Sequence, residues 1–320
     1  MKKVAIIIPF KNEREEQLAL GLSTINLQMG VDFKEIEVVL VNDGGQPIDL
    51  DKFELFTNLS INYFEIENVG PGLARQYGID HSDSEYIMFI DADDMLYHGS
   101  SLKEFFEAVA KKRHDVVLAR YIEQGKNEQG NEGFTPHPLS EKKAVYAKWY
   151  KRKHLEKNNI RFHPELRVME DTYFVPLAVE TAKDPLYLDK FVYVWLHNDD
   201  SLNRNPQTSF KSDLHTLVKA NRLRMEWYRE HKPSFIQNST TDFGTNFLLM
   251  MYSMYKEQDP TDEEAFWQEQ QAFVQDFASL MPKYSPVLQK MVDIAKNSDE
   301  TKPKTDTSDF EDFVKKSWGE

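Results

Sequence analysis

Short apolar runs alternate with amphipathic segments along roughly the first 200 residues of the chain. The runs have strand length and are hydrophobic at almost every position, which is typical of strands covered on both faces. They lie at residues 4–8, 36–41, 61–66, 85–90, 116–119 and 191–196. Helical patterns occupy residues 13–29, 68–79, 102–112, 142–158 and 168–181. This alternation predicts an α/β fold with a doubly wound, mostly parallel sheet and helices on both faces.

The rest of the chain follows other patterns. Residues 124–140 are rich in Gly, Asn, Glu and Pro and have no period, so we expect a flexible loop there. Residues 207–298 show only helical patterns, and 299–320 contain a polar, charged linker followed by a short terminal helix. We therefore expect the sheet domain to span 1–206 and an all-helical part to follow it.

Aromatic and methionine side chains recur at spacings of three and four in the helical part, at Phe247, Met250, Met251, Met254 and Tyr255. A stripe of this kind is usually part of a core or of an interface. It permits three roles besides packing: binding an acceptor, binding a partner, or forming a homo-oligomer through the C-terminal helices.

Three polar turns follow predicted strands, at Pro9–Asn12, Asn42–Gly45 and Asp91–Asp94. In a doubly wound sheet, ligands collect at the carboxyl ends of the strands, so we expect these turns to converge. Asp91, Asp93 and Asp94 repel one another unless a cation lies among them. Their hard oxygen atoms suit Mg²⁺ or Mn²⁺. The alternative is a solvated acidic turn, since Asp also favours turns.

Charge and composition narrow the choice of ligand and location. The 320 residues include 53 Asp and Glu against 39 Lys and Arg, a net charge of −14, which disfavours binding to nucleic acid or to an anionic lipid surface. The chain has no cysteine, which excludes disulfides and thiolate metal sites and fits a reducing compartment. No stretch reaches the roughly 20 apolar residues that a membrane span requires. We expect a soluble, cytoplasmic protein.

Several motifs now stand in a recognisable order. They are Ile8-Pro-Phe-Lys-Asn-Glu13, Val41-Asn-Asp-Gly-Gly45, the glycine-rich run from Asn68 to Gly78 with Arg75, Phe89-Ile-Asp-Ala-Asp-Asp94, and a block from Trp149 to Phe162 followed by Glu170-Asp171. This order resembles the inverting family 2 glycosyltransferases of the GT-A fold, which include bacterial polysaccharide and teichoic-acid sugar transferases. The chain departs from the family at Lys11, where an aromatic residue is common, and in its second turn, which often carries two acids and a Ser.

The resemblance implies a metal-dependent transfer of a sugar from a UDP-sugar to a hydroxyl group of a carbohydrate or polyol-type acceptor. It implies a transferase domain at 1–206, with nucleotide and donor contacts from Pro9, Phe10, Asn12, Asp43, Arg75, Asp91 and Ala92. Asp93 is the expected metal ligand, with His197 as a second ligand, because imidazole binds Mn²⁺. Asp171 is the expected base, beside Glu170 as an acceptor contact. Asp94 is expected to cap the segment after it.

Simpler explanations exist for the same residues. Asp43-Gly44 can be only a turn, Arg75 a surface charge, and Glu170-Asp171 acids favoured at a helix N-terminus. We expect a solvated face at Lys148–Lys153, with Trp149 or Tyr150 as an alternative stacking surface for acceptor sugars. Two other functions remain: a nucleotide-sugar-binding or assembly module without turnover, and a nucleotidyltransferase. The glycine-rich signature usual near the first strand of a nucleotidyltransferase is missing.

Overall fold

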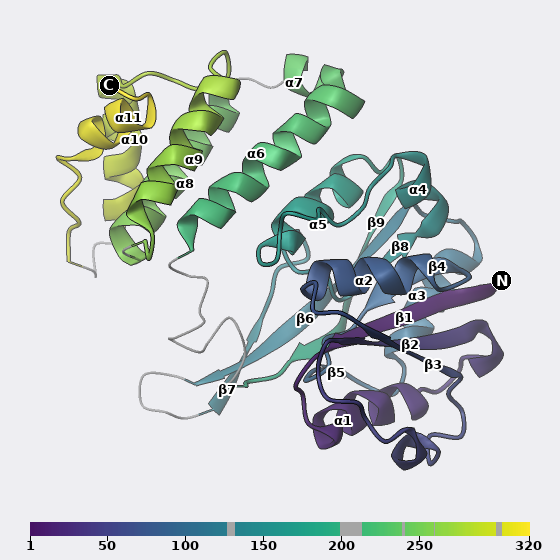
Figure 1. Cartoon of the computed structure of the whole chain (residues 1–320). Helices are drawn as coiled ribbons and strands as arrows, with labels where there is room; N and C mark the ends of the chain where they lie inside the picture. The colour runs from purple at the N-terminus through teal and green to yellow at the C-terminus, as the bar shows by residue number, and fades with distance from the viewer. Residues whose placement is uncertain (127–131, 199–212, 239–240, 259, 299–302) are drawn as a thin grey trace. The chain divides into compact units, whose positions relative to one another are not determined.

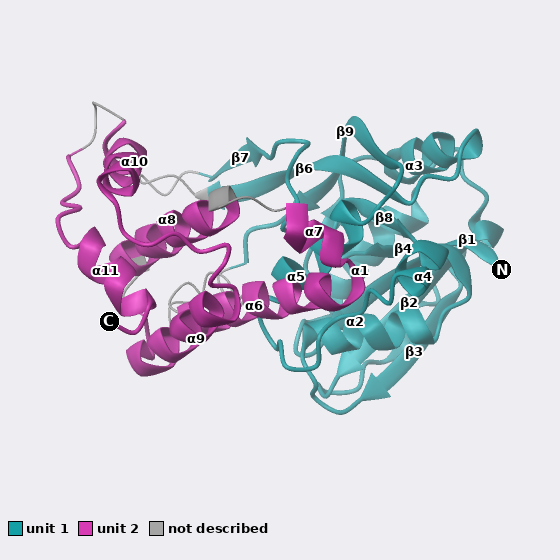
Figure 2. Ribbon diagram, turned by 90° about the horizontal axis from the view of Figure 1, so that it is seen from above, with its two compact units in different colours: residues 1–199 teal, residues 200–320 magenta. Residues whose placement is uncertain are grey.

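The computed structural model describes residues 1–126, 132–198, 213–238, 241–258, 260–298 and 303–320. The chain forms two compact units, residues 1–199 and 200–320 (Figure 2). The predicted boundary at residue 206 and the first residues of the predicted linker, 299–302, lie outside the described residues.

The described part of the first unit contains one nine-stranded sheet (Figure 1). Its strands are β1 (Lys2–Phe10), β2 (Ile36–Asp43), β3 (Ile61–Ile66), β4 (Ser84–Phe89), β5 (Met95–Leu96), β6 (Val116–Lys126), β7 (Glu132–Pro136), β8 (Lys148–Lys151) and β9 (Pro185–Trp195). The strand order is β3-β2-β1-β4-β8-β6-β9-β5, with β7 paired to β6. Strands β5, β7 and β8 are antiparallel to the other six strands. The mostly parallel α/β fold is therefore confirmed.

Helices cover both faces of this sheet. They are α1 (Glu15–Asn26), α2 (Pro71–Asp80), α3 (Ser101–Ala110), α4 (Arg152–Lys157) and α5 (Glu170–Glu180), with short 3₁₀ turns at Phe33–Glu35 and Leu50–Phe53. Trp149 of β8 stacks on Phe105 of α3, with ring centroids 5.2 Å apart. The next residue, Tyr150, packs against Phe174 of α5 at 5.4 Å. Because successive strand residues point to opposite faces, α3 and α5 lie on opposite faces.

Strand β8 corrects one expectation from the sequence. The predicted helix at 142–158 is a strand at Lys148–Lys151 followed by α4. Lys148, Trp149 and Tyr150 are fully buried, so the predicted solvated face at Lys148–Lys153 is wrong for its first three residues. Neither ring offers a stacking surface to an acceptor sugar. Four residues are too few for a strand period to stand out from the helical pattern beside them.

The predicted loop at 124–140 also differs. Strand β6 continues to Lys126 and pairs with β7 from Ile122↔Pro136 to Lys126↔Glu132. Residues 127–131, which connect these strands, lie outside the described part of the chain. Helix α1 buries Leu18, Leu22 and Ile25. Leu20 lies on its exposed side with 43% exposure, and Leu27, with 67%, follows the last helical residue, Asn26.

The regular secondary structure in the described part of the second unit is all helical. The helices are α6 (Leu214–His231), α7 (Pro233–Asn238), α8 (Thr241–Gln258), α9 (Glu263–Asp276), α10 (Pro286–Asn297) and α11 (Phe310–Ser317). Phe247 and Met251 of the aromatic and methionine stripe are buried in this unit. The expected terminal helix is α11, whose Phe313 packs against Tyr252 and Trp267. Within the described residues, none of the helices combines the length and the apolar character needed to cross a bilayer.

Candidate active site

The first two polar turns meet at the carboxyl ends of β1 and β2. Pro9 is paired with Val41, and Phe10 with Asn42. The Asn42 side chain shapes its turn: Nδ2 donates to the Gln46 carbonyl at 3.0 Å and Oδ1 accepts from the Gly45 N–H at 2.7 Å. Gly45 lies directly against the Lys11 carbonyl, and a Cβ there would overlap that oxygen atom. The predicted convergence of these two turns is therefore observed.

Asp43 joins this edge to the start of α2. Its Oδ1 accepts from the Val69 N–H at 2.7 Å and its Oδ2 from the Gly70 N–H at 2.9 Å. Gly70 has a φ of 96°, in the region that favours glycine. Each carboxylate oxygen can accept more than one hydrogen bond. The nucleotide contact predicted for Asp43 therefore stays a prediction, beside a structural role that the sequence did not indicate.

The exposed turn after β1 is held by Glu13, which the sequence did not single out as a site residue. Its Oε2 accepts from the backbone N–H groups of Lys11, at 2.7 Å, and Asn12, at 3.1 Å. The Asn12 side chain itself is exposed to solvent. The carboxylate of Glu13 also acts electrostatically on Asp93, so it belongs to the negative surroundings of the site.

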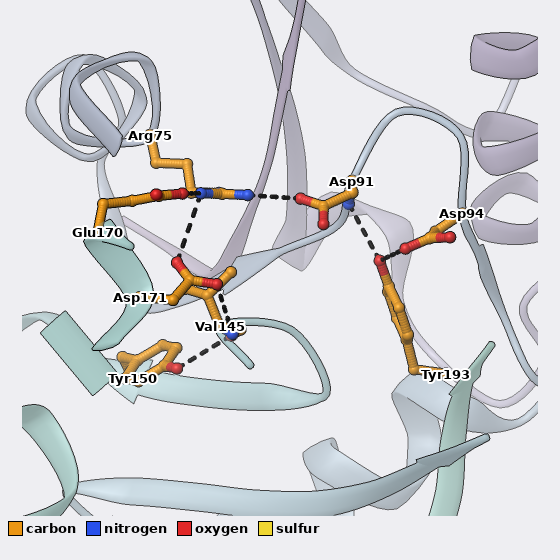
Figure 3. A network of polar contacts seen from close by, with 8 residues as sticks. All are labelled: Arg75, Asp91, Asp94, Val145, Tyr150, Glu170, Asp171 and Tyr193. Carbon is orange, nitrogen blue, oxygen red and sulfur yellow. Dashed lines mark hydrogen bonds and ion pairs between the residues drawn. The ribbon is translucent and has the colours of Figure 1, made fainter. Parts of the chain in front are cut away.

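Arg75 lies at the centre of the site and is only 5% exposed. Its Nη1 is 2.7 Å from Glu170 Oε1 and 3.5 Å from Asp171 Oδ1, while its Nη2 is 2.7 Å from Asp91 Oδ1 (Figure 3). Burial lowers the pKa of Arg75, but attraction to the three carboxylates outweighs burial and raises it. A buried guanidinium thus connects the end of β4 with the start of α5, so the explanation of Arg75 as a surface charge is wrong.

Glu170 and Asp171 occupy the first turn of α5. Met169, just before them, adopts a left-handed conformation with a φ of 59°. The Oδ2 atom of Asp171 accepts from the Val145 N–H at 3.3 Å. Burial raises the pKa of Asp171 well above its usual range, although 27% of its side chain is accessible. Arg75 opposes this rise, whereas the negative charges of Glu170 and Asp91 add to it. Such a carboxylate accepts a proton more readily than an ordinary one.

The three aspartates after β4 point to different partners. Asp91 accepts a hydrogen bond from Arg75. Asp94 is only 1% exposed, and its carboxylate accepts from the Tyr193 hydroxyl at 2.6 Å and from the Leu196 N–H at 2.8 Å. The same hydroxyl accepts from the Asp91 N–H at 3.1 Å (Figure 3). Asp94 therefore fixes the turn to β9. It does not cap a helix, because α3 begins after Ser100.

Asp93 lies beside the turn that follows β9. Its Oδ2 accepts from Asn198 Nδ2 at 2.8 Å. Burial raises the pKa of Asp93; the Asn198 hydrogen bond opposes this effect, and Asp91 and Glu13 add to it. His197 is in the same turn, held through its backbone N–H, which donates to Gln124 Oε1 at 3.1 Å. The sequence indicated this turn but not Asn198 or Tyr193, whose roles depend on contacts across about 100 positions.

Comparison with known proteins identifies the family. Residues 5–169 match the family model described as glycosyl transferase family 2. The poly(ribitol-phosphate) β-N-acetylglucosaminyltransferase TarP of Staphylococcus aureus is 23% identical over 69% of this chain and 72% of its own length. A cholesterol galactosyltransferase of Borreliella burgdorferi is 25% identical over 73% of each protein.

Solved structures show the same fold over nearly the whole chain. A crystal structure of S. aureus TarS 1–349 has a TM-score of 0.67 and 18% identity, covering 99% of this chain and 90% of that one. A second TarS structure, in complex with UDP-GlcNAc, has a TM-score of 0.66 at the same identity and coverage. The family model covers more than half of the chain and includes Asp43, Arg75 and Asp91. The chain is a member of glycosyltransferase family 2.

Proposed function

We propose that this glycosyltransferase moves a sugar from a UDP-sugar to an acceptor hydroxyl, with inversion, in a single displacement. The observation that carries the proposal is the position of Arg75, which binds Asp91 on one side and Glu170 on the other. Asp91 belongs to the edge that holds Pro9, Phe10 and the second turn, the expected place of the nucleotide. Glu170 precedes Asp171, so one cation connects the donor side with the base.

Asp171 is the proposed base. A single displacement with inversion needs a proton acceptor on the face opposite to the leaving group. Burial raises the pKa of Asp171, and the carboxylate stays within reach of solvent with 27% exposure. Glu170 already binds Arg75 at 2.7 Å and is 8% exposed, which suits it better to holding Arg75 and an acceptor hydroxyl than to taking the proton.

Asp93 is the proposed ligand of a divalent cation. Within the described residues, no group of three or more His, Asp or Glu side chains is placed to hold a metal. Mg²⁺ commonly uses one or two carboxylates together with substrate phosphates and water, so a larger protein cluster is not required. Asp93 would hold the ion with His197 as the second ligand, and the ion would neutralise charge on the departing UDP.

The acceptor class follows from the chemistry and from the relatives. Their names give ribitol-phosphate polymers and cholesterol as acceptors, which have hydroxyl groups in common. We assign a carbohydrate or polyol hydroxyl here, and UDP-N-acetylglucosamine as the first donor to test, because it is the ligand of a TarS structure of the same fold.

A donor panel tests this proposal. UDP-N-acetylglucosamine, UDP-glucose and UDP-galactose would each be incubated with the full chain and MnCl₂, MgCl₂ or EDTA, and UDP release measured. We expect one donor to be hydrolysed faster than the others and EDTA to suppress the reaction. Absence of UDP release from every donor with either metal would overturn the proposal. Pyrophosphate release from UTP and a sugar phosphate would indicate a nucleotidyltransferase instead.

A further inference from the structure

Lys148, at the start of β8, is a buried cation that the proposed reaction does not use. Its side chain is only 1% exposed. Its Nζ donates to the Ala144 carbonyl at 2.7 Å and to the Tyr146 carbonyl and Glu141 Oε2, both at 3.4 Å. A buried ammonium is normally retained only where hydrogen bonds and an opposite charge compensate for its lost hydration. All of its partners here belong to one segment, residues 141–146.

Tyr150 holds the same segment from the next position on the same face of β8. Its hydroxyl donates to the Val145 carbonyl at 2.9 Å. Lys148 and Tyr150 face α5, whereas Trp149 between them faces α3. The carbonyls of Ala144, Val145 and Tyr146 are thus bound by two side chains of one strand.

The backbone between this segment and β8 is also constrained. Ala147 has a φ of 54°, a left-handed conformation that is rare for a residue with a side chain. Such conformations persist where surrounding contacts hold them, and they are frequent at functional sites. The hydrogen bonds of Lys148 and Tyr150 span this residue, because both donors follow it in the chain and the carbonyls that accept precede it. They supply that restraint.

These contacts fix the direction in which the backbone N–H of Val145 points. Val145 lies between the two carbonyls that bind Lys148, and its N–H donates to Asp171 Oδ2 at 3.3 Å (Figure 3). We propose that Lys148 and Tyr150 are positioning residues for the base, because they hold the Val145 N–H against Asp171 and so favour its ionised form. This inference rests on the proposed role of Asp171 as the base.

The electrostatic surroundings support the direction of the effect. The charged and titratable groups that face Asp171 are Arg75 from α2, Glu170 from α5, Asp91 after β4, Tyr146 before β8, and Lys148 and Tyr150 from β8. Arg75 and Lys148 are the two cations in this set. Loss of Lys148 removes positive charge and releases the Val145 N–H, and both changes raise the pKa of Asp171.

The test compares three variants by the pH dependence of kcat/KM for UDP release, with the donor that the panel shows to be fastest. In Lys148→Met we expect the acid limb to move up by about one pH unit, as for a lost hydrogen bond to a charged acceptor. In Tyr150→Phe we expect a smaller shift in the same direction. Trp149→Phe is the matched control, because it changes the same strand on the opposite face, and its acid limb should stay in place.

A second measurement does not depend on turnover. The pKa of the Asp171 carboxyl can be followed by NMR with ¹³C-labelled aspartate, with the signal assigned by its loss in Asp171→Asn, and it should rise in both variants. An unshifted carboxyl pKa in a folded variant, or an equal shift in Trp149→Phe, would overturn the inference. If Lys148→Met does not fold, Tyr150→Phe decides. Wild-type turnover in Asp171→Asn would instead overturn the proposed base itself.

Discussion

Arg75 and Glu170 form a buried ion pair, with Nη1 2.7 Å from Oε1 and side-chain exposures of 6% and 10%. The partners are 95 positions apart, one in α2 and one in α5. Gly72, one turn before Arg75, permits this approach, since a Cβ there would lie 2.9 Å from the Cβ of Glu170. The pair therefore joins two helices whose N-terminal ends border the candidate site.

Replacing Arg75 by Met should lower the free energy of unfolding by about 3–5 kcal/mol, because it leaves the buried Glu170 and two partly buried aspartates without their cation. Urea unfolding would measure this loss. The double variant Arg75→Met/Glu170→Gln removes part of the uncompensated charge, so it should be more stable than the sum of the two single changes predicts. Strict additivity would contradict the coupling of the two residues.

Asp171→Asn should reduce kcat for transfer by about 10²–10⁴-fold, the usual contribution of a positioned base. UDP affinity should stay within about twofold, because the expected nucleotide contacts lie at the other end of Arg75. Initial rates and calorimetric UDP titration would separate the two effects. Glu170→Gln is the control of similar size and position, and a larger loss of kcat there than in Asp171→Asn would exchange the roles of the two acids.

The pH profile of the wild-type enzyme should reflect the raised pKa of Asp171. A base must be deprotonated to act, so kcat/KM should fall as the pH decreases through this pKa. Because burial raises the pKa well above 3.8, the fall should occur at a higher pH than for an ordinary Asp. Rates of UDP release between about pH 4 and 9 would locate the limb. Full activity down to about pH 4 would exclude a buried Asp base.

Asp93→Asn should weaken the dependence of UDP binding on Mn²⁺, because it removes a charge from the proposed metal ligand. UDP titration with MnCl₂ and with EDTA would give two affinities for each protein. We expect a large difference in the wild type and a small one in the variant. Asn198→Ala is a useful comparison, since it removes the donor to Asp93 Oδ2 and leaves the Asp93 carboxylate in place. UDP binding that EDTA leaves unchanged in the wild type would refute the metal site.

Gly45→Ala should lower the free energy of unfolding by about 3 kcal/mol, because the added Cβ would overlap the Lys11 carbonyl. The same change should weaken nucleotide binding, since it separates the turns after β1 and β2. Gly125→Ala in β6 is the matched control: a Cβ there meets no atom within 4 Å, so stability should change by less than about 0.5 kcal/mol. Equal unfolding midpoints in urea would contradict this prediction.

The parts of the fold that the sequence predicts well are those with a strong local signal. Strands β1 and β2 are apolar almost throughout and buried on both faces, so they stand out from their neighbours. Strand β8 does not, because it is only four residues long and two of them are lysines, one of which is buried beside two large rings. Its identity depends on pairing with β4 and β6, which local patterns do not contain.

The same distinction applies to the candidate site. The carboxyl ends of the strands identify Asp43 and Asp91 as polar residues at turns, and the family resemblance singles out Asp171. The structure brings Asp91 and Asp171 to one guanidinium. The structural role of Asp43 depends on backbone N–H groups of residues 69 and 70. Likewise, the partner of Asp94 is 99 positions away, so neither bond is visible in a local pattern.

The reversed direction of β8 has an evolutionary consequence. Since it runs against β4, the segment that enters it arrives at the edge where β4 ends, and this brings Val145 beside Asp171. An insertion or deletion of one residue at Ala147 would exchange the two faces of the strand, placing Lys148 under α3 and Trp149 under α5. Selection should therefore tolerate changes of side chain in this strand more readily than changes of its length.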